Sequence, residues 1–458
     1  MPSPWITDER AALVTDLYQL TMLQAYRREG LDADATFDLF VRRLPPSRSY
    51  LVACGLDDTL RYLEAVRFTD DALDYLGTLG LFDAAFLDGL RGFRFTGTVR
   101  AVPEGTVVFA NEPILEVTAP IAEAQLVETF LLNQVTFQTA IASKAARVVR
   151  AARGRPVAEF GMRRAHGTDA ALKGARATWI AGCASTSDVE AGRVYGIPVS
   201  GTMAHSYIEA HDGEADAFRA FAALYPETVL LVDTYDTLRG VERVIALARE
   251  LGDAFAVRAL RLDSGDLAAL AKAARRMLDE AGLTGVGLFA SSSLDEYAIT
   301  ELIEAGAPID GFGVGTRLAT SSDAPALDSV YKLAAYAGQP RMKLAEGKTT
   351  LPGAKQVWRR TGPDGRFSGD VIGTADEALE GTPLLVEVMR DGRRTDAGRD
   401  DLAAIRARAA DQLARLPERL HALEPAEPPY PVEVSARLGA LRDEVQAALR
   451  TQHALPGR

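Results

Sequence analysis

Cysteine is scarce in this sequence, which holds two cysteines among 458 residues, Cys54 and Cys183. They lie far apart, and neither has a second pair of metal-ligating residues nearby. The sequence therefore predicts neither a disulfide framework nor a structural zinc site. We expect a protein of a reducing compartment, the cytoplasm.

Lysine and long apolar segments are also rare. Only seven of the 51 basic residues are lysines, and the formal net charge is −12. An acidic chain is a poor partner for nucleic acid or an anionic membrane, so we expect neither, and any anion site must be local. No apolar run approaches the ~18 residues of a membrane span, and the first residues lack the charged and apolar regions of a signal peptide.

The middle of the chain has the clearest architecture. Short apolar runs alternate with helical patterns between about residues 156 and 316, which predicts βαβ units and a parallel sheet. Six such units can close into a barrel or form an open doubly wound sheet; periodicity does not choose, and we favour the barrel. The expected strands are 156–160, 197–201, 228–232, 256–262, 285–290 and 309–315.

The two flanking regions have a different pattern. Before residue 140, helices mix with separate strands, as is typical of an α+β domain. After about residue 330, strand-like segments and turns rich in proline and glycine precede amphipathic helices. The expected helices are 57–66, 71–79, 123–152, 401–417 and 433–450.

Polar residues follow several of the expected strands. Thr202 and His205 come just after the second strand, and Arg261 and Asp263 lie at the end of the fourth. The carboxyl ends of parallel strands meet at one edge of a sheet, where ligands bind in this fold class. Taken alone, a histidine in such a place can equally cap or pack a helix.

Two further stretches suit a phosphate group. GFGVGT at 311–316 offers backbone N–H groups free of Cβ atoms, followed by a hydroxyl. Arg163 and Arg164 follow Gly161, where a guanidinium can grip a phosphate or carboxylate through two hydrogen bonds. A tight turn and a surface arginine pair explain the same residues, so each motif is weak by itself.

Seven stretches taken in order, over residues 13–360, closely resemble nicotinate phosphoribosyltransferases. The resemblance implies an enzyme that makes nicotinate mononucleotide and pyrophosphate from nicotinate and phosphoribosyl pyrophosphate. It also implies coupled ATP hydrolysis and a place in NAD salvage. The stretches are LVTDLYQLTMLQAY (13–26), EFGMRRAHGTDAAL (159–172), STSDVEAGRVYGIPVSGTMAHSYI (185–208), LLVDTYDTLRG (230–240), RLDSGDL (261–267), GFGVGTRLATS (311–321) and YKLAAYAGQPRMKLAEGKTTLPGAKQVWR (331–359).

The resemblance also implies a fold of class α/β, with an irregular, TIM-like α/β barrel beside an α+β domain built from both chain ends. We expect an N-terminal α+β domain over 1–140 and the catalytic barrel over 141–330. The C-terminal segment, 331–458, is expected to contribute strands that pack with the N-terminal domain and then amphipathic helices.

The resemblance assigns roles around the pyridine ring and at the ATP step. His205 looks like the histidine that ATP phosphorylates, and neutral imidazole is nucleophilic near pH 7. Tyr18 and Phe160 resemble the aromatic pair that stacks on the flat ring, with Tyr18 reaching in from a second subunit of a homodimer. Thr202 and Arg261 look like contacts to nicotinate, because a guanidinium matches a carboxylate.

The remaining roles concern phosphoribosyl pyrophosphate. Arg163 resembles the residue that grips this substrate, whereas Gly313, Gly315 and Thr316 resemble the loop for its 5′-phosphate. By the same match, Asp263 is expected near the ribose, with Asp233 near a bound Mg²⁺. Carboxylates there would stabilise the positive charge that develops on the ribose as pyrophosphate leaves.

One position departs from the family pattern. Residue 188 is Asp, where nicotinate-specific relatives more often carry Asn and the related nicotinamide enzymes carry Asp. A carboxylate beside a carboxylate substrate would repel it, so we expect Asp188 to pair with an arginine and point away from the ring. The alternatives are a nicotinamide phosphoribosyltransferase, a quinolinate phosphoribosyltransferase, and a catalytically silent ligand-binding relative.

Overall fold

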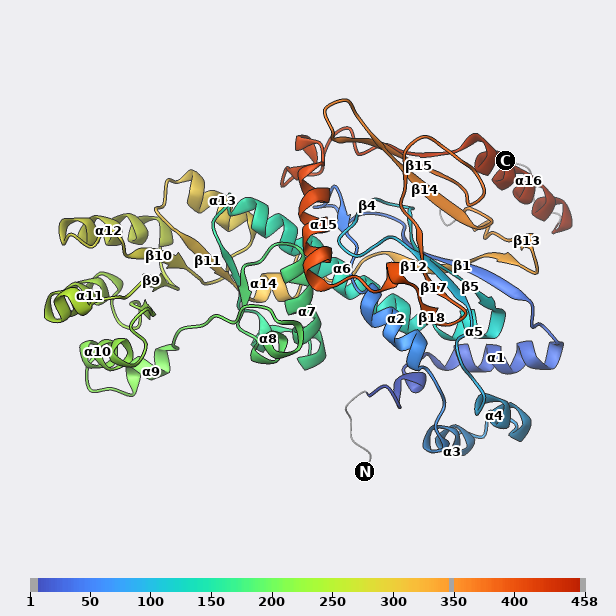
Figure 1. Cartoon of the computed structure of the whole chain (residues 1–458), viewed down its shortest axis with the longest axis horizontal. Helices are drawn as coiled ribbons and strands as arrows, with labels where there is room; N and C mark the ends of the chain where they lie inside the picture. The colour runs from blue at the N-terminus through green and yellow to red at the C-terminus, as the bar shows by residue number, and fades with distance from the viewer. Residues whose placement is uncertain (1–6, 346–349, 454–458) are drawn as a thin grey trace. The chain divides into compact units, whose positions relative to one another are not determined.

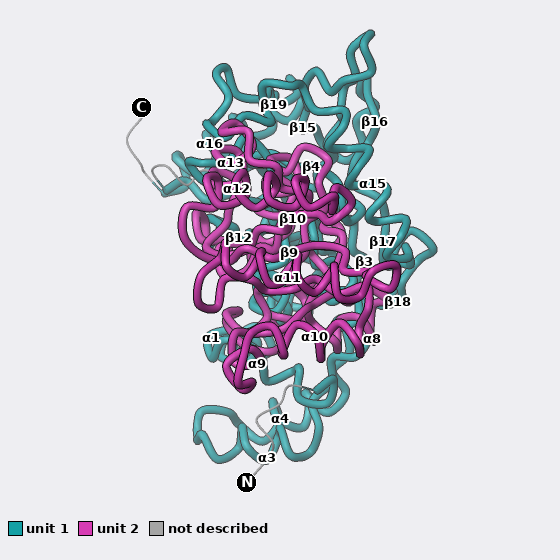
Figure 2. The backbone as a smooth tube through the Cα atoms, turned by 90° about the vertical axis from the view of Figure 1, so that its left-hand side faces the viewer, with its two compact units in different colours: residues 1–140, 326–458 teal, residues 141–325 magenta. Residues whose placement is uncertain are grey.

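The computed structural model describes residues 7–345 and 350–453 (Figure 1). The chain divides into two compact units (Figure 2). Unit 1 holds residues 1–140 and 326–458, and unit 2 holds residues 141–325. Unit 1 therefore draws on both ends of the chain.

Unit 1 is organised by a seven-stranded antiparallel sheet of order β13-β12-β1-β5-β3-β17-β18. Its interior strand β1 (Asp34–Val41) lies between β12 (Ser329–Tyr336) and β5 (Pro113–Pro120). A strand from the second half of the chain thus completes a sheet begun in the first half. The other strands are β13 (Gln339–Pro340), β3 (Thr98–Ala101), β17 (Val386–Arg390) and β18 (Arg393–Arg394).

Two smaller sheets complete the strands of unit 1. A four-stranded sheet has the order β16-β14-β15-β19, and a two-stranded sheet pairs β2 with β4. Only the pairing of β15 with β19 is parallel among them. The bounds are β16 (Thr382–Pro383), β14 (Lys355–Thr361), β15 (Phe367–Thr374), β19 (Val432–Val434), β2 (Leu51–Val52) and β4 (Val107–Val108).

The helices expected in the flanking regions form close to their predicted bounds. The long helix predicted over 123–152 is instead two helices, with α5 ending before Val127 and α6 beginning after it. The helices are α1 (Leu17–Glu29), α2 (Leu56–Ala65), α3 (Asp70–Thr78), α4 (Ala84–Leu90), α5 (Ile121–Leu126), α6 (Glu128–Ala151), α15 (Leu402–Ala414) and α16 (Ala436–Gln452).

Unit 2 is built on a parallel six-stranded sheet of order β7-β6-β11-β10-β9-β8. The predicted α/β class is confirmed. The sheet is a curled half-barrel, since no pairing within the described residues joins β8 to β7, and the closed barrel that we favoured is only partly realised. The strands are β6 (Val157–Glu159), β7 (Ser185–Thr186), β8 (Val229–Leu231), β9 (Ala259–Leu262), β10 (Gly287–Ala290) and β11 (Gly311–Val314).

Five of the six strands predicted in this region form. The sixth, over 197–201, is reduced to an isolated parallel bridge between Val199 and Thr186. Proline lacks the N–H that a ladder needs, so Pro198 limits this segment at the edge of the sheet. Patterning missed β7 altogether, because two residues carry no detectable period.

Helices connect the parallel strands, as right-handed crossovers require. α12 (Leu267–Glu280) illustrates why they form where they do. The Asp266 side chain accepts a hydrogen bond from the Ala269 N–H at the N-terminus, and Ala271, Ala274 and Leu278 form its buried face. The others are α7 (Thr168–Ile180), α8 (Val189–Tyr195), α9 (His205–Glu209), α10 (Glu214–Leu224), α11 (Thr237–Leu251), α13 (Glu296–Glu304) and α14 (Thr316–Ala319).

No helix within residues 7–345 and 350–453 combines the length and apolar character needed to cross a bilayer. Both cysteines are buried, and neither forms a disulfide bond.

Candidate active site

Arg261 and Thr202 meet at the carboxyl edge of the parallel sheet of unit 2. Arg261 Nη1 donates to Thr202 Oγ1 over 2.9 Å, and Nη2 donates to the Met203 carbonyl over 2.9 Å. Burial lowers the pKa of Arg261, against the attraction of Asp263 and Asp233 and together with repulsion from Arg163. Two of its five N–H groups are used, so the guanidinium keeps donors for a ligand carboxylate.

His205 begins α9 and faces two other elements of the sheet edge. Its Nδ1 lies 3.1 Å from Thr234 Oγ1, after β8, and its Nε2 lies 3.9 Å from Asp263 Oδ2, after β9. Ser291, after β10, donates to the other oxygen of Asp263, Oδ1, over 2.6 Å. The imidazole is therefore oriented on one side and remains half-exposed on the other, as a nucleophile requires.

Asp233, at the end of β8, has one oxygen held and one free. Oδ2 accepts from the Asp263 N–H over 2.9 Å and from Ser264 Oγ over 2.6 Å. Oδ1 is buried and has no hydrogen-bond partner in the described part of the chain. No group of three or more metal-ligating side chains occurs among the described residues. A lone buried carboxylate oxygen nevertheless suits Mg²⁺, which binds one or two carboxylates together with substrate phosphates.

Phe160 follows β6, and its ring packs over a glycine of the neighbouring strand. A Cβ on Gly313 would come within 2.6 Å of the Phe160 ring, and the Phe289 ring lies 6.0 Å from that of Phe160, centre to centre. Gly313 is thus buried inside β11 and needs its missing Cβ to admit the ring. Sequence reasoning gave a phosphate loop or a tight turn as the reason for this glycine, and neither involves the Phe160 ring.

The remaining phosphoribosyl candidates lie close by in unit 2. Gly315 precedes the short helix α14, and Thr316 is the exposed first residue of that helix. Arg163 is exposed in a single 3₁₀ turn, Met162–Arg164, after Phe160. Their phosphate-binding roles stay predictions. Tyr18 belongs to unit 1, on the first turn of α1, with 48% of its surface exposed.

Comparison with known proteins identifies the family. A model of the nicotinate phosphoribosyltransferase N-terminal domain matches residues 13–136, and a model of the nicotinate phosphoribosyltransferase family matches residues 156–356. The chain is 56% identical to nicotinate phosphoribosyltransferase pncB2 of Mycobacterium tuberculosis over 427 residues, covering 93% of this chain and 92% of that protein. This chain belongs to the nicotinate phosphoribosyltransferase family.

Two further family relatives agree with this assignment. Nicotinate phosphoribosyltransferase of Bacillus subtilis is 47% identical over 381 residues, covering 81% of this chain and 78% of that protein. The crystal structure of human nicotinic acid phosphoribosyltransferase is similar over 94% of this chain and 99% of that chain, with a TM-score of 0.84 and 31% identity. The resemblance drawn from the sequence is confirmed.

Asp188, the position that departs from the family pattern, is buried at the start of α8. Its Oδ1 accepts hydrogen bonds from the N–H groups of Glu190 (2.9 Å) and Ala191 (3.1 Å). The expected arginine partner is wrong, since no ion pair to Asp188 occurs within the described residues. The helix N-terminus supplies the stabilisation that we had assigned to a guanidinium.

Residues of this sheet edge that sequence reasoning missed are small hydroxyl groups and one glutamate. Thr234, Ser264 and Ser291 each directly follow a strand or one of its terminal carboxylates, and each orients a predicted site residue. Their position after expected strands was a usable signal. Glu159, discussed below, carried no signal of its own because it lies inside a predicted strand.

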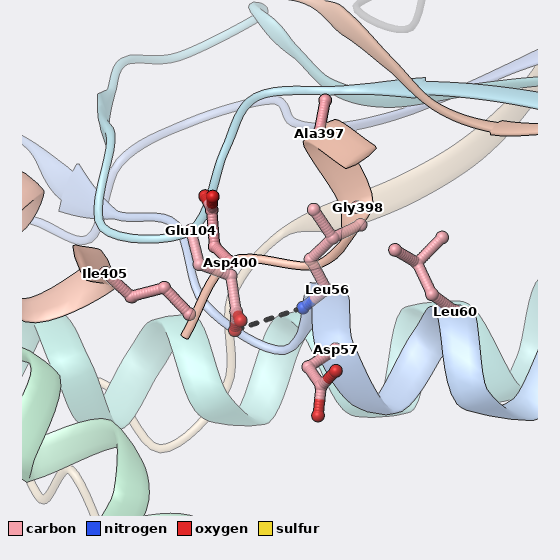
Figure 3. Close-up of a pocket in the computed structure, with 8 residues that line it drawn as sticks. All are labelled: Leu56, Asp57, Leu60, Glu104, Ala397, Gly398, Asp400 and Ile405. Atoms are coloured by element: carbon pink, nitrogen blue, oxygen red, sulfur yellow. Dashed lines mark hydrogen bonds between the residues drawn. The ribbon is translucent and has the colours of Figure 1, made fainter. Parts of the chain in front are cut away.

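A pocket in unit 1 is lined by other residues (Figure 3). Leu56 on α2 donates its N–H to Glu104 Oε1 over 3.2 Å in its wall. None of the predicted site residues lines it. Its lining residues are Leu56, Asp57, Leu60, Glu104, Ala397, Gly398, Asp400 and Ile405.

Proposed function

We propose that this protein transfers the phosphoribosyl group of phosphoribosyl pyrophosphate to nicotinate, forming nicotinate mononucleotide and pyrophosphate. The identity to curated nicotinate phosphoribosyltransferases over nine-tenths of the chain carries the proposal. The juxtaposition of Arg261, Thr202 and Asp263 at one sheet edge supports it, because these residues supply what a carboxylate substrate and a ribose cation need.

The transfer forms one bond and breaks one. The ring nitrogen of nicotinate, unprotonated near pH 7, attacks C1 of the ribose as the bond from C1 to the pyrophosphate oxygen breaks. Arg261 binds and orients the nicotinate carboxylate, and Phe160 with Tyr18 stacks on the ring. Asp263 stabilises the positive charge that develops on the ribose. No general base is needed, so orientation and charge stabilisation suffice.

The phosphate groups fall to other residues. Arg163 binds phosphoribosyl pyrophosphate. The 5′-phosphate of this substrate lies against the end of β11 and the start of α14, at Gly313, Gly315 and Thr316. Asp233 would hold Mg²⁺ through its free oxygen, and the ion would supply charge neutralisation for the leaving pyrophosphate when bound. The free, buried Oδ1 of Asp233 supports this assignment.

ATP hydrolysis is coupled through His205 in this proposal. The γ-phosphoryl group passes to an imidazole nitrogen while its bond to ADP breaks, and water later releases phosphate from the phosphohistidine. Thr234 occupies Nδ1, which leaves Nε2 as the attacking atom. A dianionic group there would order the adjacent loops by charge-assisted hydrogen bonds.

The same proposal includes a homodimer in the cytoplasm, with Tyr18 entering the partner's site. Leu17 and Tyr18 expose about half of their surface on the first turn of α1, where an apolar contact is available. A protein that is monomeric by light scattering and fully active in the assay would exclude the shared site.

The deciding experiment supplies the purified protein with Mg²⁺, phosphoribosyl pyrophosphate and either nicotinate or nicotinamide, with and without ATP. We expect nicotinate mononucleotide and ATP stimulation. Consumption of nicotinamide instead would show that the protein is a nicotinamide phosphoribosyltransferase with the same fold. Binding of phosphoribosyl pyrophosphate without turnover on either pyridine would contradict the proposal and favour a silent ligand-binding relative.

A further inference from the structure

Glu159 is a buried carboxylate at the end of β6, directly before Phe160. Only 4% of its surface is exposed. Its Oε1 accepts the Gly161 N–H, and its Oε2 accepts the hydroxyl of Thr186 on β7 over 2.7 Å. Both oxygens therefore hold groups of the sheet edge, and one of them belongs to the residue that follows Phe160.

The hydrogen-bond chain continues to a second loop. Thr186 Oγ1 accepts the Asp188 N–H over 3.0 Å, and Asp188 in turn caps α8. Glu159 thus connects the start of the Phe160 loop to the start of α8 through one threonine hydroxyl.

The backbone around Phe160 has little freedom to adapt. The Phe160 N–H donates to the Val314 carbonyl over 2.8 Å. A Cβ on Gly161 would come within 2.3 Å of Ala319 Cβ and 3.0 Å of the Gly315 carbonyl. The turn is therefore packed closely against α14 and the residue before it, and Glu159 Oε1 lies within 2.8 Å of the same Cβ position.

Burying the Glu159 carboxylate costs desolvation free energy, which a purely structural role does not explain. Burial raises the pKa of Glu159, against the hydrogen bonds from Thr186 and Gly161, which lower it, and with a smaller upward contribution from Asp188. No cation pairs with Glu159 in the described part of the chain. A buried carboxylate without a cation carries a desolvation cost, which the hydrogen bonds from Gly161 and Thr186 offset in part. Residues that break a local stability rule gather at functional sites.

We propose that Glu159 is a positioning residue for the pyridine site, which holds the Phe160 ring and the Asp188 loop in register through Gly161 and Thr186. The inference rests on the proposed function, because it takes Phe160 as the stacking residue. Glu159 does not touch the substrate. Its effect reaches nicotinate through the two loops that it ties together.

Two isosteric variants break this chain at different points. Glu159→Gln keeps an acceptor for Gly161 but leaves the Thr186 hydroxyl hydrogen without one. Thr186→Val removes that hydroxyl, so that Glu159 Oε2 and the Asp188 N–H both lose their hydrogen-bond partner. Thr186→Ser keeps the hydroxyl. Thr178→Val is the matched control, because it removes another buried threonine hydrogen bond of unit 2, to the Ala175 carbonyl inside α7.

The readouts are the KM for nicotinate, the KM for phosphoribosyl pyrophosphate, kcat, and calorimetric binding of nicotinate. Glu159→Gln and Thr186→Val should each raise the KM and Kd for nicotinate about tenfold, with at least a fivefold smaller effect on the other substrate. Thr186→Ser should restore values near wild type. The double variant should be no worse than either single variant, because both break one unit.

The outcomes separate this inference from the proposed function. Equal loss toward both substrates, additive losses, or the same change in Thr178→Val would overturn the positioning role. Wild-type protein that binds nicotinate without turnover would overturn the proposed reaction, while the nicotinate Kd values still decide the role of Glu159. Wild-type protein that neither binds nor converts nicotinate would overturn both.

Discussion

Arg261 donates to Thr202 Oγ1 over 2.9 Å, so two segments 59 positions apart share one hydrogen bond at the sheet edge. Arg261→Lys replaces the planar guanidinium by a single ammonium group. The ammonium cannot keep the hydrogen bond to Thr202 and also bind both oxygens of a carboxylate. We expect kcat/KM for nicotinate to fall about 10- to 100-fold, as the loss of charged hydrogen bonds implies. Steady-state kinetics with varied nicotinate measures this.

Arg258→Lys is the control for this substitution. Arg258 lies three positions earlier and pairs with Glu227 on the surface. It should leave the kinetics unchanged. A loss of the same size in both variants would remove the special role of Arg261.

Gly313→Ala tests the packing of the Phe160 ring. The new Cβ would lie 2.6 Å from that ring, so the ring must move, and overpacking of this kind costs about 1–3 kcal/mol. We expect the KM for nicotinate to rise about tenfold and the KM for phosphoribosyl pyrophosphate to rise less, because the new Cβ meets the Phe160 ring directly. Gly285→Ala, where a Cβ meets open space, is the control. A rise for phosphoribosyl pyrophosphate alone would instead favour the phosphate-loop role of Gly313.

The parallel sheet was predictable because its strands are short, largely apolar segments that alternate with helical patterns, and this alternation leaves a signal that needs no tertiary information. Closure of the sheet into a barrel was not predictable, since it depends on strand tilt and on the edge strands, where residues such as Pro198 interrupt the pairing. The grouping of Thr202, Arg261 and Asp263 followed from the strand ends. The hydrogen-bond partner of Asp188 could not be predicted in this way, because a helix N-terminus and a guanidinium can each stabilise a carboxylate. Only the position of α8 shows which of the two is present.

His205→Ala tests the coupling of ATP to the transfer. Without the imidazole no phosphohistidine forms, so ATP stimulation should vanish while an ATP-independent rate remains. Thr234→Val should weaken the stimulation, because it removes the partner of Nδ1. Initial rates with and without ATP, together with mass-spectrometric detection of the phosphorylated peptide, measure both effects.

The exposed His453 near the chain end gives the control, His453→Ala. This variant should behave as wild type. Full ATP stimulation in His205→Ala would refute the phosphohistidine.

Asp188→Asn tests whether residue 188 selects the pyridine. Asn and Asp cap helices about equally well, so the variant should retain α8 and leave the preference for nicotinate over nicotinamide unchanged. Asp188→Ala loses the cap and should lower the free energy of unfolding by about 1 kcal/mol. Competition between the two pyridines and urea unfolding check these results. A preference that moves from nicotinamide in wild type to nicotinate in Asp188→Asn would show that the carboxylate faces the substrate.

Asp38, on the interior strand β1 of unit 1, should make the stability of the protein depend on pH. Its Oδ2 lies 2.7 Å from the Lys355 ammonium, both side chains are almost fully buried, and Glu116 lies directly opposite on β5. Burial, with a smaller contribution from Glu116, raises the pKa of Asp38 to about 7 against the attraction of Lys355. Between the unfolded value of 3.8 and about 7, the folded state holds a proton that the unfolded state has lost.

Because the folded state binds more protons in that window, stability is fully present below about pH 4 and falls as the pH rises through 7. Asp38→Asn cannot ionise and should remove a decrease on the order of 2–3 kcal/mol between pH 5 and 8. Urea unfolding, followed by hydrogen exchange of β1 amides to report on unit 1, measures the two slopes. Asp34→Asn, at the exposed start of the same strand, should keep the wild-type slope. A wild-type slope in Asp38→Asn would assign the titration to another group, because only ionisation at position 38 differs between the two proteins.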